Sequence, residues 1–233
     1  MMDKEPGGLF RIKRKLMHLR YKPIRVFCLH HVTNVYDDSM RQNDWLPLDV
    51  FKTRILSMQQ QGVCFISLVE ACHHLQNDLF RFKQYAVLTF DDGYKSFHEV
   101  LPWLKEHQLP VCLFINGKYL DGVSYRKDPR ECYLTEKELF QLSDTLFEIG
   151  SHGWEHKDIC NLSESEFMIS EQRNLQLLST HPRFIPFHAF TYGHYRGDSL
   201  DILSKLGMTP VFVDGVKNYH NPNGVHRELM QVR

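Results

Sequence analysis

The sequence lacks the features that mark several specialised classes of protein. No stretch approaches the roughly 20 consecutive apolar residues that a membrane-spanning helix needs, and the N-terminus has no apolar core of the kind found in signal peptides. Lysine plus arginine equals aspartate plus glutamate, at 28 each, so no excess of positive charge points to nucleic acid. We therefore expect a cytoplasmic protein with no nucleic-acid partner.

Paired cysteines are missing as well. The six cysteines stand singly, form no Cys-x-x-Cys motif, and in several cases lie in apolar runs. This pattern predicts reduced, buried thiols, although an even number of cysteines leaves disulfides open.

The sequence does contain enough apolar residues for one large domain. It has 233 residues, of which 42% are hydrophobic and 24% charged, and short apolar runs alternate with amphipathic stretches. Capping-box pairs at Thr135 with Glu138 and at Ser163 with Glu166 predict the starts of two helices. The predicted strands are Ile24–Leu29, Val63–Ile66, Tyr85–Phe90, Val111–Ile115, Phe187–Phe190, Val211–Val213 and Leu229–Val232. Repeated β-α units of this number predict an α/β fold, a distorted or incomplete (β/α) barrel with its chemistry at the carboxyl ends of the strands.

Residues 1–23 differ from the rest of the chain. Leu9, Ile12, Leu16 and Leu19 recur at helical spacing, and lysine and arginine fill many of the positions between them. Such a basic amphipathic segment suits peripheral contact with an anionic membrane through residues 1–21, and it equally suits a helix packed on the outside of the domain. We expect the catalytic domain to span residues 24–233.

Two adjacent carboxylates end one of the predicted strands. Tyr85 to Phe90 is apolar, β-branched and aromatic, and Asp91, Asp92 and Gly93 follow directly. Neighbouring carboxylates at the end of a buried strand repel each other and are costly to desolvate, so a fold keeps them there only where something compensates. A metal ion would do so, with one carboxylate as its ligand and the other accepting a proton from water. A simple Asp-Gly turn is the alternative.

A pair of histidines supplies the second chemical signal. His152 and His156 would lie on one face of a helical turn, close enough to share a metal ion with a carboxylate from elsewhere in the chain. With Glu155 the same stretch also fits the H-x-x-E-H pattern of a zinc peptidase. That interpretation needs a helix interior, which Gly153 disfavours, and it leaves the carboxylate pair unexplained.

Taken together, these segments resemble a known family. The run Thr89 to Gly93, followed further along by Gly150 to His152 with His156, is similar to the first two motifs of the polysaccharide deacetylases, the NodB-like carbohydrate esterase family four. Phe190 to Gly193 is similar to the family's third motif. The resemblance covers the chain from about Ile24 onward. It implies a distorted (β/α) barrel of the NodB-like type and metal-dependent removal of N- or O-acetyl groups from a sugar.

The resemblance also implies roles for single residues. Asp91 would be the catalytic base, while Asp92, His152 and His156 would bind the metal ion. A backbone N–H near Tyr192 would help to stabilise the oxyanion that forms when water attacks the acetyl carbonyl.

The general acid is assigned through one branch of the family. In that branch the third-motif arginine that braces the base is absent, and the segment with the acid histidine lies at the start of the domain. The present chain has Ala189 and Thr191 where the third motif commonly carries arginine and proline, and Val26 to His30 resembles the relocated segment. His30 would then protonate the leaving amine. His220 and His226, near the C-terminal end, are alternatives.

The ligand set and the resemblance predict the chemical class of the cofactor and of the substrate. Two imidazoles and a carboxylate suit Zn²⁺, and the same set would hold Co²⁺, Ni²⁺ or Fe²⁺. We expect an N-acetylated sugar or glycan precursor of polysaccharide and cell-envelope metabolism, for example a nucleotide-linked or lipid-linked sugar. Two other functions stay open: a zinc peptidase, in which Glu155 rather than Asp91 is essential, and a non-catalytic carbohydrate- or membrane-binding module that has kept the fold.

Overall fold

A computed structural model describes residues 22–37, 40, 44–77, 82–123, 130–219 and 223–231. In these residues seven parallel strands close into a barrel. The strands are β1 (Arg25–Leu29), β5 (Gln84–Phe90), β6 (Val111–Ile115), β7 (Phe147–Ser151), β8 (Phe184–Ala189), β9 (Thr209–Val213) and β10 (Val225–Leu229). The basic segment of residues 1–21, and with it the predicted membrane contact, lies outside the described residues, as does His220.

Pairing between β1 and β5 closes the barrel. The strands follow one another in the order β1, β10, β9, β8, β7, β6 and β5, and β5 then pairs with β1 from Arg25 opposite Ala86 to Leu29 opposite Phe90. A further strand, β4 (Val63–Phe65), pairs with the first half of β5, whereas β6 pairs with its second half. The predicted (β/α) barrel is therefore confirmed.

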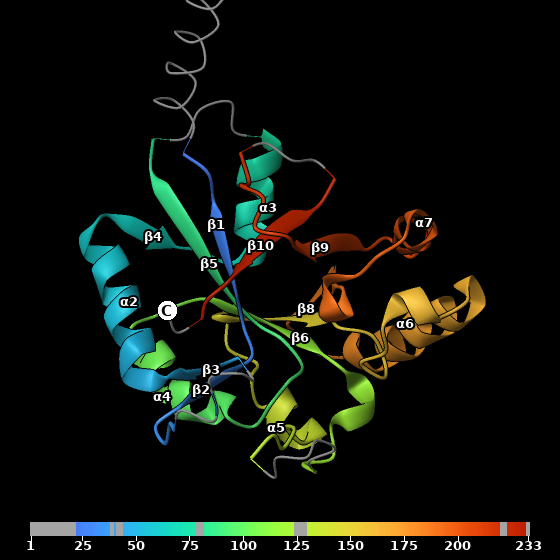
Figure 1. The fold of residues 1–233 in the computed structure, drawn as a ribbon, viewed down its shortest axis with the longest axis horizontal. Helices are drawn as coiled ribbons and strands as arrows, with labels where there is room; N and C mark the ends of the chain where they lie inside the picture. Colours follow the sequence, from blue (N-terminus) through green and yellow to red (C-terminus); the bar gives the residue numbers. More distant parts are fainter. Residues whose placement is uncertain are drawn as a thin grey trace, which may run out of the picture.

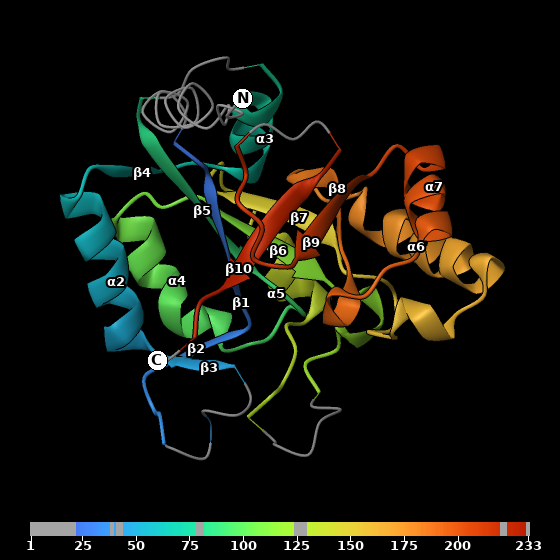
Figure 2. The same cartoon turned by 45° about the horizontal axis from the view of Figure 1, so that its top comes forward.

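Helices cover the barrel from outside. α2 (Leu48–Gln60) and α4 (Phe97–Glu106) lie on one side, and α6 (Glu164–Leu178) and α7 (Gly197–Lys205) lie on the opposite side (Figure 1, Figure 2). The remaining helical elements are α3 (Leu68–Asn77), α5 (Glu136–Phe140), and three short 3₁₀ turns, η2 (Gly117–Tyr119), η3 (Ile159–Asn161) and η4 (Thr191–Gly193). Strands β2 (His31–Thr33) and β3 (Trp45–Pro47) form a small separate sheet beside α4.

Both predicted capping boxes are present. Thr135 accepts a hydrogen bond from the N–H of Glu138 at the start of α5, and Ser163 accepts one from the N–H of Glu166 at the start of α6. In each case the glutamate side chain reaches back to the N–H of the capping residue, so two otherwise unpaired donors are satisfied. None of the helices in the described part of the chain has the length and apolar character that a membrane crossing requires.

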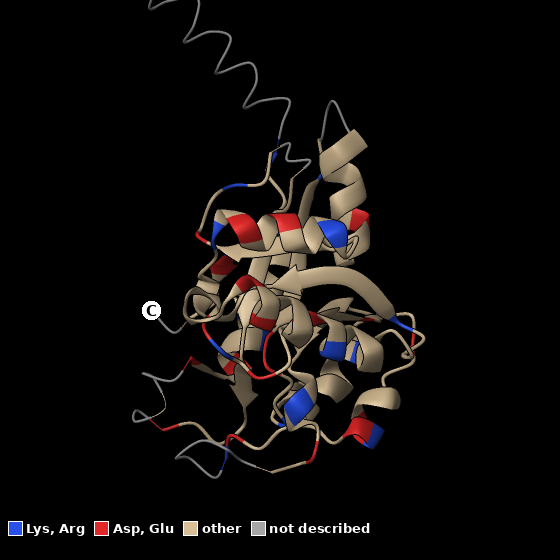
Figure 3. Cartoon of the chain, turned by 90° about the vertical axis from the view of Figure 1, so that its right-hand side faces the viewer, with Lys and Arg blue, Asp and Glu red and all other residues tan. Residues whose placement is uncertain are grey.

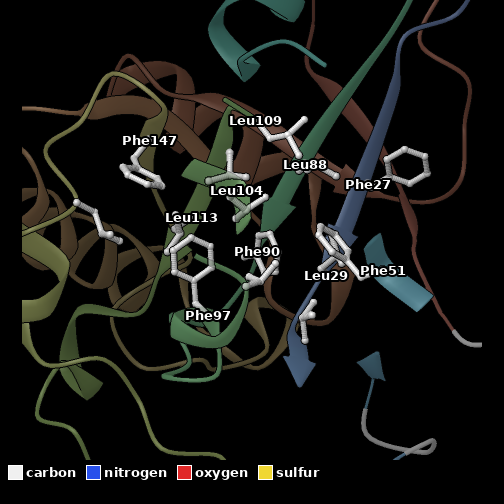
Figure 4. Packing of buried hydrophobic residues seen from close by; sticks show 14 of the residues in the cluster. Phe27, Leu29, Phe51, Leu88, Phe90, Phe97, Leu104, Leu109, Leu113 and Phe147 are labelled. Carbon is white, nitrogen blue, oxygen red and sulfur yellow. The ribbon is translucent and has the colours of Figure 1, made fainter. Parts of the chain in front are cut away.

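Strand residues alternate between two apolar clusters. Phe27, Leu88 and Leu113 face outward and pack with aromatic and aliphatic side chains of α2 and α4 (Figure 4). The alternate positions face into the barrel, where they form a smaller cluster that includes Val26, Val87, Cys112, Phe114, Ala189 and Val211. Charged residues of both signs are interspersed along the helices and loops (Figure 3). The period of two thus gives each strand two buried faces, which explains its continuous apolar sequence.

The C-terminal strand differs from its prediction. We expected Leu229–Val232, whereas β10 is Val225–Leu229. The apolar residues near the end of the chain predicted a strand there. The observed strand instead carries Arg227 at an inward position, and this residue is completely buried. A charged residue in the barrel interior breaks the apolar pattern on which the prediction depended.

Gly150 makes room for a large side chain inside the barrel. A Cβ atom at this position of β7 would lie 2.6 Å from a ring carbon of Phe114 and 3.1 Å from the carbonyl oxygen of Phe187. Neither neighbour can move freely, because Phe114 is fully buried and the carbonyl belongs to β8. The absence of a side chain at Gly150 is therefore a packing requirement.

Gly150→Ala should destabilise the fold by about 1–3 kcal/mol, the usual cost of overpacking a filled interior. Urea denaturation followed by circular dichroism measures this free energy of unfolding. Gly197→Ala is the matched control, because the first residue of α7 has open space around its Cα, and it should leave stability unchanged or slightly raised. Equal stability of the two variants would contradict the packing argument.

Candidate active site

A cavity of about 590 Å³ opens at the carboxyl ends of the barrel strands. Loops that follow parallel strands meet at this end of a barrel, and here they bring together residues distant in sequence. The lining includes all six candidate residues: His30 after β1, Asp91 and Asp92 after β5, His152 and His156 after β7, and Tyr192 after β8. The predicted site residues therefore form one constellation.

Asp91 is held by three strands. Its backbone N–H donates to the carbonyl oxygen of Leu29 at 2.9 Å, which joins the ends of β5 and β1. Arg227 of β10 donates to both carboxylate oxygens, with Nη1 to Oδ1 at 2.5 Å and Nη2 to Oδ2 at 2.9 Å. The thiol of Cys28, from β1, also donates to Oδ2 at 3.4 Å. Neither Arg227 nor Cys28 is predicted as a site residue from the sequence.

Burial and Arg227 act in opposite directions on Asp91. Loss of water raises the pKa of this carboxyl, but the attraction of Arg227, together with that of His152, outweighs burial and lowers the pKa to about 2. Asp91 is therefore ionised at neutral pH. An ionised carboxylate on the wall of a cavity can accept a proton from water inside it.

Asp92 points toward two imidazoles. Its Oδ1 lies 3.3 Å from Nε2 of His152 and 3.0 Å from Nε2 of His156, yet this oxygen is buried and has no hydrogen bond of acceptable geometry among the described residues. A buried carboxylate oxygen without such a bond is costly unless a cation lies beside it. The three ligand atoms lie within 4.8 Å of one another, as a shared metal ion requires.

The tautomer of His152 suits metal binding. Its Nδ1 lies 2.7 Å from the carbonyl oxygen of Ala189. A carbonyl only accepts hydrogen bonds, so Nδ1 carries the hydrogen and the neutral ring presents the lone pair of Nε2 toward Asp92. Burial lowers the pKa of His152, but Asp91 and Asp92 more than offset burial and raise it. The centre thus attracts positive charge, and its carboxylate and two imidazoles fit a divalent transition ion.

Backbone strain concentrates around the cavity. Of the five non-glycine residues with positive φ in the described chain, four line it: Asp44 (57°), Asp92 (70°), His156 (26°) and Tyr192 (58°). Left-handed backbone costs free energy for residues with a Cβ atom and persists where the surroundings enforce it. The i, i+4 spacing predicted a helical turn from His152 to His156. The segment is instead an irregular loop, and its bends place the centroids of the two imidazole rings 5.3 Å apart.

The structure distinguishes the adjacent histidines after β1. His31 is stacked between Trp45 and Tyr94, with ring centroids 3.9 and 4.0 Å away, and its Nδ1 lies 3.0 Å from the hydroxyl of Ser96. The ring of His30 instead has a nitrogen within 4.8 Å of a carboxylate oxygen of Asp91. Both histidines line the cavity, and His30 is the one whose ring nitrogen lies near the carboxylate of Asp91.

Two other candidate residues, His226 and Glu155, do not line the cavity that contains Asp91. His226 pairs with Asp214 at 2.7 Å and borders a different cavity beside Ile24 and Asn218, at the amino end of β1. Glu155, which the peptidase interpretation requires as a base, binds Lys118 at 2.9 Å and Lys157 at 2.7 Å and does not line the cavity of Asp91. The zinc-peptidase interpretation is therefore wrong.

Comparison with known proteins identifies the family. The model for the family described as polysaccharide deacetylase matches residues 81–211, which is more than half of the chain. The chain therefore belongs to the polysaccharide deacetylase family, whose members are hydrolases acting on carbon–nitrogen bonds. No curated protein sequence matches the chain.

Solved structures share the fold. The chain resembles IcaB from Ammonifex degensii (20% identity, TM-score 0.76, covering 93% of this chain and 94% of that one). It also resembles the Streptococcus pyogenes deacetylase PplD in complex with acetate (20% identity, TM-score 0.74, covering 91% and 93%). A de-N-acetylase from Aggregatibacter actinomycetemcomitans matches at 18% identity with a TM-score of 0.68, covering 90% and 95%. At these identities the likeness concerns the barrel itself.

Arg227→Met should lower the free energy of unfolding of the metal-free protein by about 3–5 kcal/mol at pH 7, since it leaves the buried Asp91 without its cation. In the wild type, the lowered pKa of Asp91 means that the pair stabilises the fold above the ordinary pKa of 3.8, and this contribution is lost as the pH falls toward about 2. The difference between wild type and variant should therefore shrink in acid, as denaturation curves between pH 7 and pH 3 would show.

Asp91→Asn provides the matched background for that measurement. Because asparagine carries no charge, Arg227→Met should lower the free energy of unfolding much less in the Asp91→Asn background than in the wild type. The double-mutant cycle gives the coupling energy between the two residues. A cost that is the same in both backgrounds, or that does not change with pH, would contradict the ion-pair account.

Proposed function

We propose that the chain is a metal-dependent deacetylase that hydrolyses the N-acetyl, or O-acetyl, group of a sugar or glycan of polysaccharide and cell-envelope metabolism. The observation that carries the proposal is the convergence of Asp92, His152 and His156 beside the Arg227-bound carboxylate of Asp91. This arrangement separates two carboxylates by role, one open to a cation and the other neutralised by an arginine. A module without catalytic activity has no need of that separation.

The chain's own residues account for the proton transfers. Asp91 accepts a proton from the water that attacks the acetyl carbonyl carbon, and Arg227 keeps the carboxylate oriented and ionised. His30 gives a proton to the amine nitrogen as the C–N bond breaks, so acetate and a free amine leave. An N–H near Tyr192 stabilises the oxyanion. When bound to Asp92, His152 and His156, a divalent ion supplies Lewis acidity toward the carbonyl and lowers the pKa of water.

Zinc is the ion that this donor set favours. One carboxylate oxygen and two imidazole nitrogens form a three-ligand set that leaves positions open, as in catalytic zinc sites. Cobalt, nickel and iron accept the same ligands, and their availability in the cell decides among them. The cavity of about 590 Å³ lies within the range of pockets that hold small ligands, roughly 300–1,000 Å³, so one acetylated sugar residue fits the proposal.

Asp92→Ala, or His152→Ala together with His156→Ala, should abolish tight binding of zinc, because a three-ligand site that loses a ligand loses much of its binding free energy. Metal analysis by mass spectrometry after dialysis gives the ion content per chain. His226→Ala serves as the control and should bind like the wild type, since His226 pairs with Asp214 away from the cavity. Undiminished zinc in the double histidine variant would refute the ligand assignment.

His30→Ala should slow acetate release from an N-acetylated glucosamine oligomer by about 10²- to 10⁴-fold, the usual contribution of a general acid. An acetyl ester whose leaving group departs as a stable anion needs no such proton, so its hydrolysis by the same variant should fall far less. A similar loss on both substrates would mean that His30 does not act as the acid. An enzymatic assay for released acetate measures the hydrolysis of both substrates.

A further inference from the structure

The loop that carries both candidate metal-binding histidines has no regular secondary structure of its own. It leaves β7 at Ser151 and bends at Gly153 (φ 78°) and again at His156 (φ 26°). Repeating backbone hydrogen bonds do not support such a path. The positions of His152 and His156 must therefore depend on contacts that the loop makes with other parts of the fold.

The hydroxyl of Ser151 joins three of those contacts at one atom. It is buried and accepts hydrogen bonds from the backbone N–H of Gly153 at 3.2 Å and from Nδ2 of Asn174 at 2.8 Å. It lies 2.8 Å from Oε2 of Glu171. Because both other partners can only donate, the hydroxyl hydrogen must point to Glu171. All three hydrogen-bonding positions of the serine oxygen are then in use.

Helix α6 supplies the other side of this network. Ser170, Glu171 and Asn174 lie on one face of α6, since residues three and four apart are neighbours on a helix. Ser170 accepts from the N–H of Trp154 at 3.0 Å. Asn174 also donates to the carbonyl oxygen of Ile115 at 2.9 Å, so the end of β6 is tied to the same helix.

Burying the side chain of Glu171 costs free energy. Its side chain is fully buried, Oε2 is shared by Ser151 and by Nδ1 of His188 at 2.8 Å, and Oε1 has no hydrogen-bond partner among the described residues. A Cβ atom on Gly153 would lie 3.5 Å from that oxygen, so the carboxylate stands directly against the loop. A partly satisfied buried carboxylate costs stability, and its contact with the loop gives a reason for keeping it.

We propose that Ser151 and Glu171 are positioning residues for the metal centre. Through them α6 fixes the bend at Gly153, so that Nε2 of His152 and Nε2 of His156 both face Oδ1 of Asp92 before any ion binds. The inference rests on the proposed function for the identity of the centre, but its subject is the shape of the loop. Side chains that orient metal ligands change metal affinity without touching the ion.

The test compares Ser151→Ala and Glu171→Ala with two controls. Glu171→Gln keeps an acceptor oxygen for Ser151 and His188 and is the conservative variant. Ser199→Ala removes another fully buried serine hydroxyl, which bonds to the carbonyl oxygen of Arg196 at the start of α7 and has no contact with the loop. It therefore reports what the loss of a buried hydroxyl does to stability alone.

Zinc affinity, measured by competition with a coloured chelator, is the first readout. Ser151→Ala and Glu171→Ala should bind zinc about 10- to 100-fold more weakly than the wild type, whereas Glu171→Gln and Ser199→Ala should stay close to it. Wild-type affinity in Ser151→Ala would overturn the inference. An equal loss in Ser199→Ala would do the same, because it would show a general effect of lowered stability.

Hydrogen exchange of the metal-free proteins is the second readout. Ser151→Ala should speed exchange at the amides of Gly153 and Trp154, and Ser199→Ala should not; unchanged exchange in the loop would overturn the inference. This readout needs neither metal nor substrate. If the wild type bound no metal and released no acetate, the proposed function would fail, and the exchange comparison would still decide whether α6 shapes the loop.

Discussion

The ion pair between Asp91 and Arg227 is the interaction on which the rest of the site depends. Two adjacent carboxylates at the end of β5 would repel each other in a buried position, and one positive charge inside the barrel cancels one of them. The other, Asp92, remains uncompensated by arginine or lysine on the cavity wall and faces two imidazole nitrogens. Charge therefore distinguishes the two carboxylates: Asp91 is neutralised by Arg227, and Asp92 is open toward the imidazoles.

The barrel is built to contain this arginine. Arg227 lies over the ring of Phe114 at 5.1 Å from its centroid and donates to the hydroxyl of Thr89 at 3.0 Å. On β7, Gly150 leaves space for Phe114, the ring over which Arg227 lies. Packing in the interior and electrostatics at the mouth are thus parts of one arrangement: a larger residue at Gly150 would displace Phe114, the ring that supports the arginine beside Asp91.

Those parts of the site that depend on neighbouring residues could be predicted from the sequence. Asp91 and Asp92 follow a strand whose apolar run is unmistakable, and His152 and His156 stand within one short segment. The barrel followed from the alternation of strands and helices, and both capping boxes marked true helix starts. In each case the information lies within a few residues of sequence, where periodicity and hydrogen-bonding rules apply.

Parts that depend on distant pairing could not be predicted. Arg227 contacts Asp91 because β1 pairs with β10 on one side and with β5 on the other. The charge of Arg227 also interrupts the apolar pattern by which β10 would have been recognised. The loop of His152 and His156 was expected as a helical turn, because spacing alone does not reveal that Ser151 and α6 bend it. His30 was assigned from the resemblance, but the aromatic stack that encloses the neighbouring His31 joins residues distant in sequence and is seen only in the structure.

The central claim is that Asp91, held ionised by Arg227, removes the proton from the attacking water while a metal centre stands beside it. Acetate release by Asp91→Asn from an N-acetylated glucosamine oligomer tests this most directly, provided that its zinc content is first shown to equal that of the wild type. An amide cannot accept the proton at neutral pH, so the account predicts a loss of about 10²- to 10⁴-fold in kcat with the metal retained. Wild-type turnover in a fully metal-loaded Asp91→Asn protein would contradict it.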